Sequence, residues 1–424
     1  MMSEAPAIRA TRTPTDWKGE VMRRRIARRY AAERRFRLWG LLAVLVSAGF
    51  LAFLLISMIS SGARGFTQTR IALPIDFPRA PIMIDPATLS TNPHQVLASA
   101  NLPAVIESAA VAAFGENGGD YVSSGAVAAL RKAIIADPEI LTRKATITVP
   151  ASEGIDLAAK SDGSAADEAA VTRLKQAGAL STAFNARFLT ASDGTDPTVV
   201  GIWGALKGSL LTMGITLLLS FPVGVFAALY LEEYAPRNRW TDIIEVSINN
   251  LAAVPSIIFG LLGLAIFLNM MHLPRSAPIV GGLTLALMTM PVIVIAGRNA
   301  IKAVPPSIRD AALGIGASPV QVVFHHVLPL ALPGILTGTI IGMARSLGET
   351  APLLMVGMRA FVASPPGGFT DPSTVLPVQI FLWSDEVGKG FIEKTSAAII
   401  VLLLFLLTMN SIAIYLRNKF EKKW

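Results

Sequence analysis

The chain has 424 residues, of which 52% are hydrophobic and only 16% are charged, and its formal net charge is +8. This composition is typical of membrane proteins. The sequence has no cysteine, which excludes disulfides and cysteine-ligated metal sites. The positive charge does not describe a nucleic-acid-binding domain, because residues 1–37 carry eleven Lys and Arg against four Asp and Glu, whereas residues 61–200 carry eleven against fourteen. Basic residues beside membrane spans mark the cytoplasmic side.

The first 60 residues predict a basic cytoplasmic N-terminus, 1–37, followed by a first transmembrane helix, 38–60. Leu38 to Ile59 is a nearly unbroken apolar run, long enough for about 30 Å of hydrocarbon. No clear cleavage site follows it, so an uncleaved anchor is expected rather than a signal peptide. The arginines that precede it keep the N-terminus in the cytoplasm and favour contact with anionic lipid.

Residues 61–200 contain no apolar run of spanning length and predict a small α+β insert domain on the periplasmic side. Alternating or β-branched segments predict strands, and 3.6-residue spacing predicts helices. The expected strands are Arg70–Phe77 and Ala145–Val149, and the expected helices are Leu102–Phe114 and Ala126–Ile135. Ser164 is expected to cap a third helix that ends near Gly178. No catalytic or metal-ligating constellation is found at usable spacing, so an enzyme is not expected.

Residues 201–416 predict a core of five more transmembrane helices, and 417–424 a basic cytoplasmic tail. The third span is expected to run from Asp242 to Met270, and Pro255 inside it most often means a kink that neighbouring helices support. The predicted fold class is therefore an all-α polytopic membrane protein of about six transmembrane helices, with both termini in the cytoplasm and the small α+β insert outside.

The stretch Ala344–Leu354 contains Arg345 and Glu349, the only formal charges between Leu328 and Gly357. An ionisable group at bilayer depth costs a few kcal/mol or more and usually faces a bundle interior or a water-filled path. Four residues apart on one helix, the two side chains would share a face. Either they contact a transported ion, or they pair with polar groups of a partner and lock the bundle.

The predicted inner loop, residues 301–329, has an acid and two alanines (Asp310, Ala311, Ala312), then Gly316, and finally Leu328 and Pro329 at the start of the next span. This pattern resembles the EAA loop of type I ABC-importer permeases. Asp310 stands where glutamate is usual and His326 where isoleucine is usual. The resemblance implies that the loop docks on an ATPase subunit and carries its motion into the membrane.

Three segments narrow the resemblance: Ala344–Leu354, Asn250–Gly260 and Leu376–Ile380. Over roughly residues 200–420 the chain resembles PstA-type permeases of the bacterial high-affinity phosphate importer. The resemblance implies a heterodimer with the homologous permease PstC, two copies of the ATPase PstB, and the periplasmic binding protein PstS. It further implies that Arg345 and Glu349, with Thr350 beside them, take part in the passage of inorganic phosphate.

The chain has no G-x-x-x-x-G-K-S/T sequence, so it is not expected to hydrolyse ATP by P-loop chemistry. No cofactor or metal is expected on this chain, and ATP with Mg²⁺ would be used by the partner ATPase. Two alternatives stay open. The cargo could be another oxyanion (molybdate, sulfate or phosphonate), or the chain could be a membrane scaffold that senses through its insert.

Overall fold

The computed structural model describes residues 19–82, 84, 93–160, 162–359 and 361–420. Residues 1–18 of the predicted N-terminus and 421–424 of the predicted tail lie outside the described residues. Two compact units are present, one up to Ser57 and one from Met58 onward. Helix α1 (Glu20–Gly65) belongs to both, and it contains the predicted span 38–60 and extends beyond both of its ends.

In the first unit, α1 is a single uninterrupted helix, and no residue in its most apolar stretch is buried. Its large apolar side chains, such as Phe50 and Phe53, meet no protein surface within this unit. A helix that is apolar all round is stable in hydrocarbon, where its backbone groups are satisfied internally.

The insert in the second unit is built on a three-stranded antiparallel sheet in the order β2-β1-β3. The central strand is β1 (Thr67–Asp76), and β2 is Lys144–Pro150. Both predicted strands are thereby confirmed. The third strand, β3 (Leu180–Phe184), was not predicted, because it is short and has no alternating apolar pattern.

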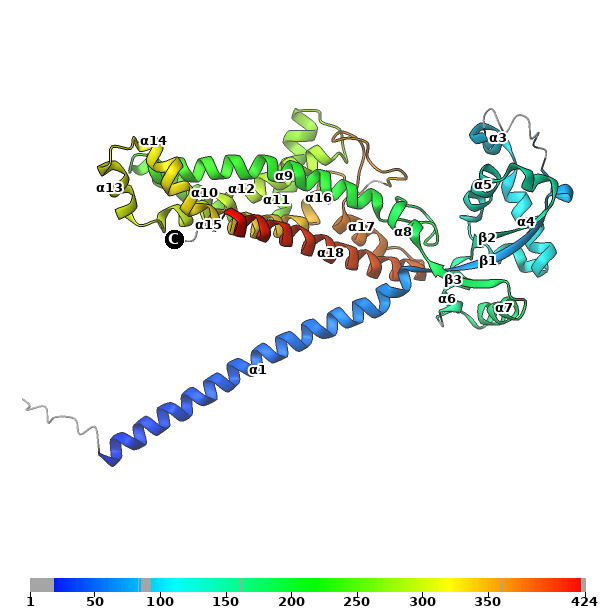
Figure 1. Cartoon of the computed structure of the whole chain (residues 1–424), viewed down its shortest axis with the longest axis horizontal. Helices are drawn as coiled ribbons and strands as arrows, with labels where there is room; N and C mark the ends of the chain where they lie inside the picture. Colours follow the sequence, from blue (N-terminus) through cyan, green and yellow to red (C-terminus); the bar gives the residue numbers. More distant parts are fainter. Residues whose placement is uncertain (1–18, 83, 85–92, 161, 360, 421–424) are drawn as a thin grey trace, which may run out of the picture. The chain divides into compact units, whose positions relative to one another are not determined.

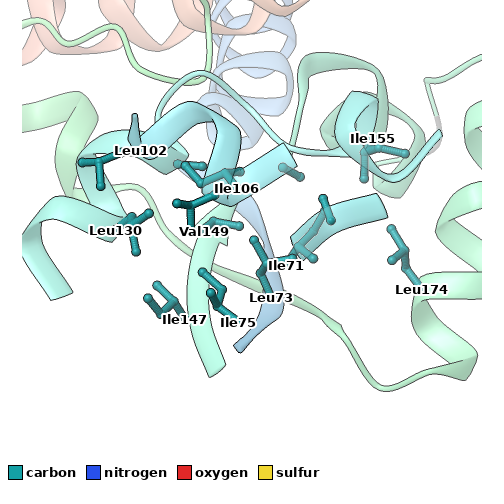
Figure 2. Packing of buried hydrophobic residues seen from close by; sticks show 14 of the residues in the cluster. Ile71, Leu73, Ile75, Leu102, Ile106, Leu130, Ile147, Val149, Ile155 and Leu174 are labelled. Carbon is teal, nitrogen blue, oxygen red and sulfur yellow. The ribbon is translucent and has the colours of Figure 1, made fainter. Parts of the chain in front are cut away.

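One face of the sheet carries the core of the insert. Ile71, Leu73 and Ile75 alternate along β1 and are at most 2% exposed, and Ile147 and Val149 of β2 lie beside them (Figure 2). Such alternation places every second side chain of a strand on the buried face.

Helices cover this core, and the predicted helices are confirmed in α4 (Leu102–Phe114) and α5 (Ala126–Ala136). The predicted cap is also confirmed, since the Ser164 hydroxyl accepts a hydrogen bond from the Asp167 backbone N–H at the start of α7 (Ala165–Gln176). The other short helices of the insert are η1 (Phe77–Arg79), α3 (Pro93–Ser99), η2 (Glu116–Tyr121), η3 (Pro138–Thr142), α6 (Glu153–Ala159) and α8 (Ala186–Thr190).

A hydrogen-bonded carboxylate organises the segment that leads out of the insert. Asp196 accepts hydrogen bonds from the hydroxyls of Ser123, Ser124 and Thr198 and from the Thr198 backbone N–H. Burial raises the pKa of Asp196, but these hydrogen bonds outweigh it and hold the pKa below its ordinary value. The carboxylate therefore stays ionised and fixes this segment against the insert.

Four long helices form the bundle and run side by side (Figure 1): α9 (Trp203–Leu229), α12 (Pro278–Lys302), α15 (Leu328–Leu347) and α18 (Lys389–Phe420). Small residues let the backbones approach, as is usual between membrane helices. A Cβ on Gly334 of α15 would lie 2.7 Å from the Cβ of Ala300, and one on Gly224 of α9 would lie 2.8 Å from Ile293. Helix α12 is therefore the centre on which α9 and α15 pack.

The predicted third span is not one straight helix. It is α10 (Arg239–Ala252) followed by α11 (Ser256–Gly263) and the π-helical turn η5 (Leu264–Met270), with a bend of 100° between the two parts. Pro255 lies at the bend, where it lacks the N–H that would continue the helix. By length and composition, the described residues hold five helices able to cross a membrane, or six if this bent pair is one span.

Short helical segments complete the bundle. The π-helical turn η4 (Tyr230–Tyr234) follows α9, and the predicted inner loop contains α13 (Pro306–Gly314), α14 (Pro319–Gln321) and the π-helical turn η6 (Val322–Val327). After α15 come α16 (Ala351–Met355) and α17 (Leu376–Ser384).

The close contact between α12 and α15 gives a stability prediction. In Gly338→Ala the new methyl group would overlap the Cβ of Ala296, so we expect a loss of about 1–3 kcal/mol from overpacking. Thermal unfolding of the purified protein measures it. Gly214→Ala in α9 is the matched control, because a Cβ there meets nothing within 4 Å. It should leave stability unchanged or slightly raised, and equal effects of the two variants would contradict the packing argument.

Candidate functional site

Arg345 lies in the last turn of α15, where the negative end of the helix dipole favours a cation. Its Nε is 3.5 Å from Oε1 of Glu349. The Arg345 side chain is 50% exposed, whereas the Glu349 side chain is only 20% exposed. The two predicted charges therefore meet, with the guanidinium on the accessible side of the pair.

The expectation that both residues share one face of one helix is wrong. Helix α15 ends at Leu347, and Gly348 is its C-cap, so Glu349 lies beyond the helix. Helix α16 then starts at Ala351, with Thr350 as its N-cap residue. Pro352 explains the break, because it has no N–H to bond the Gly348 carbonyl and its ring would clash with that carbonyl. The ion pair thus bridges a helix break.

Contacts from two other helices hold this break in place. The Ser346 hydroxyl lies 2.5 Å from the Thr289 hydroxyl of α12, and both residues are almost fully buried. On the other side, a Cβ on Gly260 of α11 would lie 2.7 Å from the Cα of Pro352. The bent span therefore packs its backbone directly against the segment that follows Arg345 and Glu349.

A cavity of about 210 Å³ lies beside α15 but does not include Arg345. Its walls come from α9, α15 and α18, and almost all of its lining residues are apolar, such as Leu217, Ile340 and Met409. This space offers an anion almost no hydrogen-bond donors. The half-exposed guanidinium of Arg345 lies outside this cavity lining.

The predicted coupling loop is a helix–turn–helix at the far end of α15. Asp310 and Ala311 are exposed on α13, whereas Ala312 is only 4% exposed and packs inward. Gly316 turns the chain with φ of +90°, a conformation that favours glycine. An exposed acid beside a sharply turned pair of short helices is suited to docking on a partner.

Leu328 and Pro329 begin α15, as the sequence predicted, but they do not begin the helical stretch. Helical structure begins at Pro319, capped by Ser318 and Gln321, and continues through η6 into α15. This stretch of 29 residues connects the loop to Arg345 without a break, about 40 Å of helix at 1.5 Å per residue. The two groups of predicted site residues therefore lie on one continuous element.

Arg309, which the sequence analysis did not single out, anchors the loop. Its Nη2 is 2.6 Å from Oε1 of Glu233 in η4. Its guanidinium also donates to the carbonyl of Ile301 in the last turn of α12 and to that of Val304 just after this helix. The sequence signal for this contact was weak. Glu232 and Glu233 follow the second span, and Arg309 lies in the predicted inner loop.

Arg298 forms a second ion pair at this end of the bundle. It lies 3.3 Å from Glu232 and 2.9 Å from Glu245. A lone arginine reaching toward the membrane interface would have been the simpler interpretation. Instead, Arg298 joins α12 to η4 and α10. Among the residues that the structure describes, no three His, Asp or Glu side chains come together as metal ligands.

Two family models match the chain, one in each half. Residues 220–424 match the model of "Binding-protein-dependent transport system inner membrane component". Residues 23–168, which include most of the insert, match "Domain of unknown function (DUF3333)".

Three relatives align with the core. "Probable ABC transporter permease protein YqgI" of Bacillus subtilis is 32% identical over 56% of this chain and 84% of its own length. "Phosphate transport system permease protein PstA" of Haemophilus influenzae is 31% identical over 53% of this chain and 77% of its own. "Phosphate transport system permease protein PstC" of the same organism is 31% identical over 48% of this chain and 70% of its own length.

The family model covers the bent span, the predicted coupling loop and the Arg345–Glu349 break. The candidate site therefore lies within the part of the chain that the relatives share. The apolar helices and the family together make it a multi-pass protein of the inner membrane. The chain belongs to the PstA-type permeases of ABC importers.

Proposed function

We propose that this chain is the permease subunit through which inorganic phosphate crosses the membrane in an ATP-driven importer. The observation that carries the proposal is the half-exposed guanidinium of Arg345, held at a helix break at the end of the helix that begins in the coupling loop. The similarity to phosphate transport permeases supports phosphate as the cargo.

The Arg345–Glu349 contact suits transient binding of an anion. Arginine presents a planar fork that matches two phosphate oxygens and is always charged. Glu349 lies 3.5 Å from Nε, and the half-exposed guanidinium has further N–H donors for phosphate. A carboxylate beside the guanidinium prevents the anion from binding too tightly, because a path must release what it binds. Thr350 follows Glu349 in the chain as the N-cap residue of α16, and we include it in the proposed path.

Coupling to ATP would enter through the loop of Asp310 and Gly316 and travel along the helix that starts at Pro319. The family implies that an ATPase of the PstB type, in two copies, binds ATP and Mg²⁺ and docks on this loop. The continuous helix gives that motion a direct route to Arg345. The chain itself would bind no cofactor.

The remaining assignments concern partners and orientation. The homologous permease would be of the PstC type, and a binding protein of the PstS type would deliver phosphate. The basic residues around α1 and at the end of α18 support cytoplasmic termini. The insert, residues 61–200, would then be periplasmic.

The cargo is tested by ATP hydrolysis of the complex reconstituted in lipid vesicles. Hydrolysis should rise with phosphate-loaded binding protein and stay at its basal rate with the sulfate-loaded protein. Equal stimulation by sulfate or molybdate would assign another oxyanion. Hydrolysis that responds to no loaded binding protein would favour the scaffold alternative.

A further inference from the structure

Four charged side chains are buried together where the insert meets the bundle: Asp156, Lys160, Glu393 and Lys394. Lys160 Nζ, just after α6, lies 2.8 Å from Oδ2 of Asp156 and 2.8 Å from Oε2 of Glu393 in α18. The three side chains are between 9% and 11% exposed, and Lys394 is 3% exposed. We refer to these four residues as the charge cluster.

The charge cluster also binds the backbone between α1 and β1. Lys160 Nζ donates to the carbonyls of Arg64 and Thr67, and Lys394 Nζ donates to the carbonyl of Gly65 at 2.9 Å. The Thr69 backbone N–H donates to Oδ1 of Asp156 at 2.7 Å. The cluster thus joins four elements: the end of α1, the start of β1, α6 and α18.

Close packing supports the same junction. A Cβ on Gly65 would lie 2.5 Å from the Glu393 carbonyl oxygen and 2.8 Å from the Cβ of Ala397, so α1 and α18 touch through their backbones. The Gly390 backbone N–H, in the first turn of α18, donates to Oε1 of Glu153 at 2.6 Å. No flexible linker separates the insert from the bundle at this place.

The two positive and two negative charges of the cluster balance. An arrangement of α6 and α18 that kept Lys160 and Glu393 buried but apart would leave each charge unpaired, which is strongly unfavourable. A buried ion pair contributes little to net stability compared with apolar packing, but it restricts which arrangements of the surrounding elements are tolerated. The cluster therefore selects one orientation of the insert relative to the last span.

We propose that Asp156, Lys160, Glu393 and Lys394 interlock the insert with the adjoining ends of α1 and α18, so that these parts move as one rigid body. The insert would then restrain the start of the last span while the permease changes conformation, instead of moving independently of it. The statement about conformational change rests on the proposed transport function, whereas the rigidity does not.

The absence of cysteine allows a direct distance measurement. Spin labels would be placed at Ala128→Cys on the exposed face of α5 and at Leu404→Cys on α18, in the assembled complex. We expect one narrow distance peak, unchanged between the nucleotide-free and the vanadate-trapped complex. A broad distribution in the otherwise unaltered chain, or a shift between the two states, would overturn the interlock.

Substitutions test whether the charges are the cause. Lys160→Met should lose the narrow peak, because two buried acids then share the single cation of Lys394. Lys160→Met combined with Glu393→Gln restores the charge balance and should recover much of it. Lys132→Met, on the exposed face of α5, is the matched control and should change nothing. A narrow peak that survives Lys160→Met would assign the junction to packing alone and refute the proposal. A failure of phosphate transport would leave these distances unaffected.

Discussion

In Arg345→Ala, phosphate uptake is expected to fall about 10- to 100-fold or more, while the complex still assembles at its normal level. The factor corresponds to losing the charge-assisted hydrogen bonds of one guanidinium, worth about 1.5–3 kcal/mol. The half-exposed position of Arg345 means that its truncation leaves no buried void. Uptake of labelled phosphate into vesicles, with co-purification of the partner subunits, measures both quantities.

Two companion variants sharpen this result. Arg345→Lys keeps the charge but loses the planar fork, so it should transport at an intermediate rate. Arg275→Ala, an exposed arginine in the turn before α12, is the matched control and should transport normally. If Arg345→Ala instead prevents assembly, the Arg345–Glu349 pair locks the bundle to the partner permease and does not contact the ion.

A second large effect is expected for Arg309→Ala, which should uncouple ATP hydrolysis from transport. The substitution leaves Glu233, 12% exposed, without its cation, and removes the donors to the Ile301 and Val304 carbonyls at the end of α12. An unsatisfied buried group of this kind costs about 1–3 kcal/mol. Helix α13 would lose its connection to η4 and to the end of α12, so the docked loop would move without carrying the second and fourth spans with it.

The measurement is the ratio of phosphate transported to ATP hydrolysed in the reconstituted complex, which should drop sharply. Lys302→Ala removes an exposed cation from the same end of α12 and should leave the ratio unchanged. Removing both partners, in Arg309→Ala with Glu233→Ala, should restore part of the stability but not the coupling. A normal ratio in Arg309→Ala would show that the loop needs no anchor to the second span.

Local patterns were sufficient for much of the fold. Apolar runs of spanning length, the alternation in β1 and the Ser164 cap each depend on a few neighbouring residues, and the structure has the corresponding elements. The coupling loop was recognisable for the same reason, since its alanines and Gly316 lie within one short segment. The presence of Arg345 and Glu349 in an apolar run was visible without any structure.

Where these residues lie depended on contacts that no local pattern contains. The break at Gly348 separates Glu349 from the helix of Arg345, and Gly260 of a distant span packs against the break. From the sequence, Gly348 and Pro352 indicate only that an unbroken helix is uncertain, because neighbouring helices decide whether a membrane helix continues past a proline.

The sequence by itself determined a multi-span membrane protein with an insert, and it placed two charges within one apolar run. Only the tertiary structure decided which charges meet. Arg309 and Glu233 are 76 positions apart, and Lys160 and Glu393 are 233 apart. Side chains so distant in the chain are brought together by packing of the whole bundle and insert. Burying an unpaired charge is costly, so a charged residue in the sequence indicates that a partner exists. It does not indicate which residue that partner is.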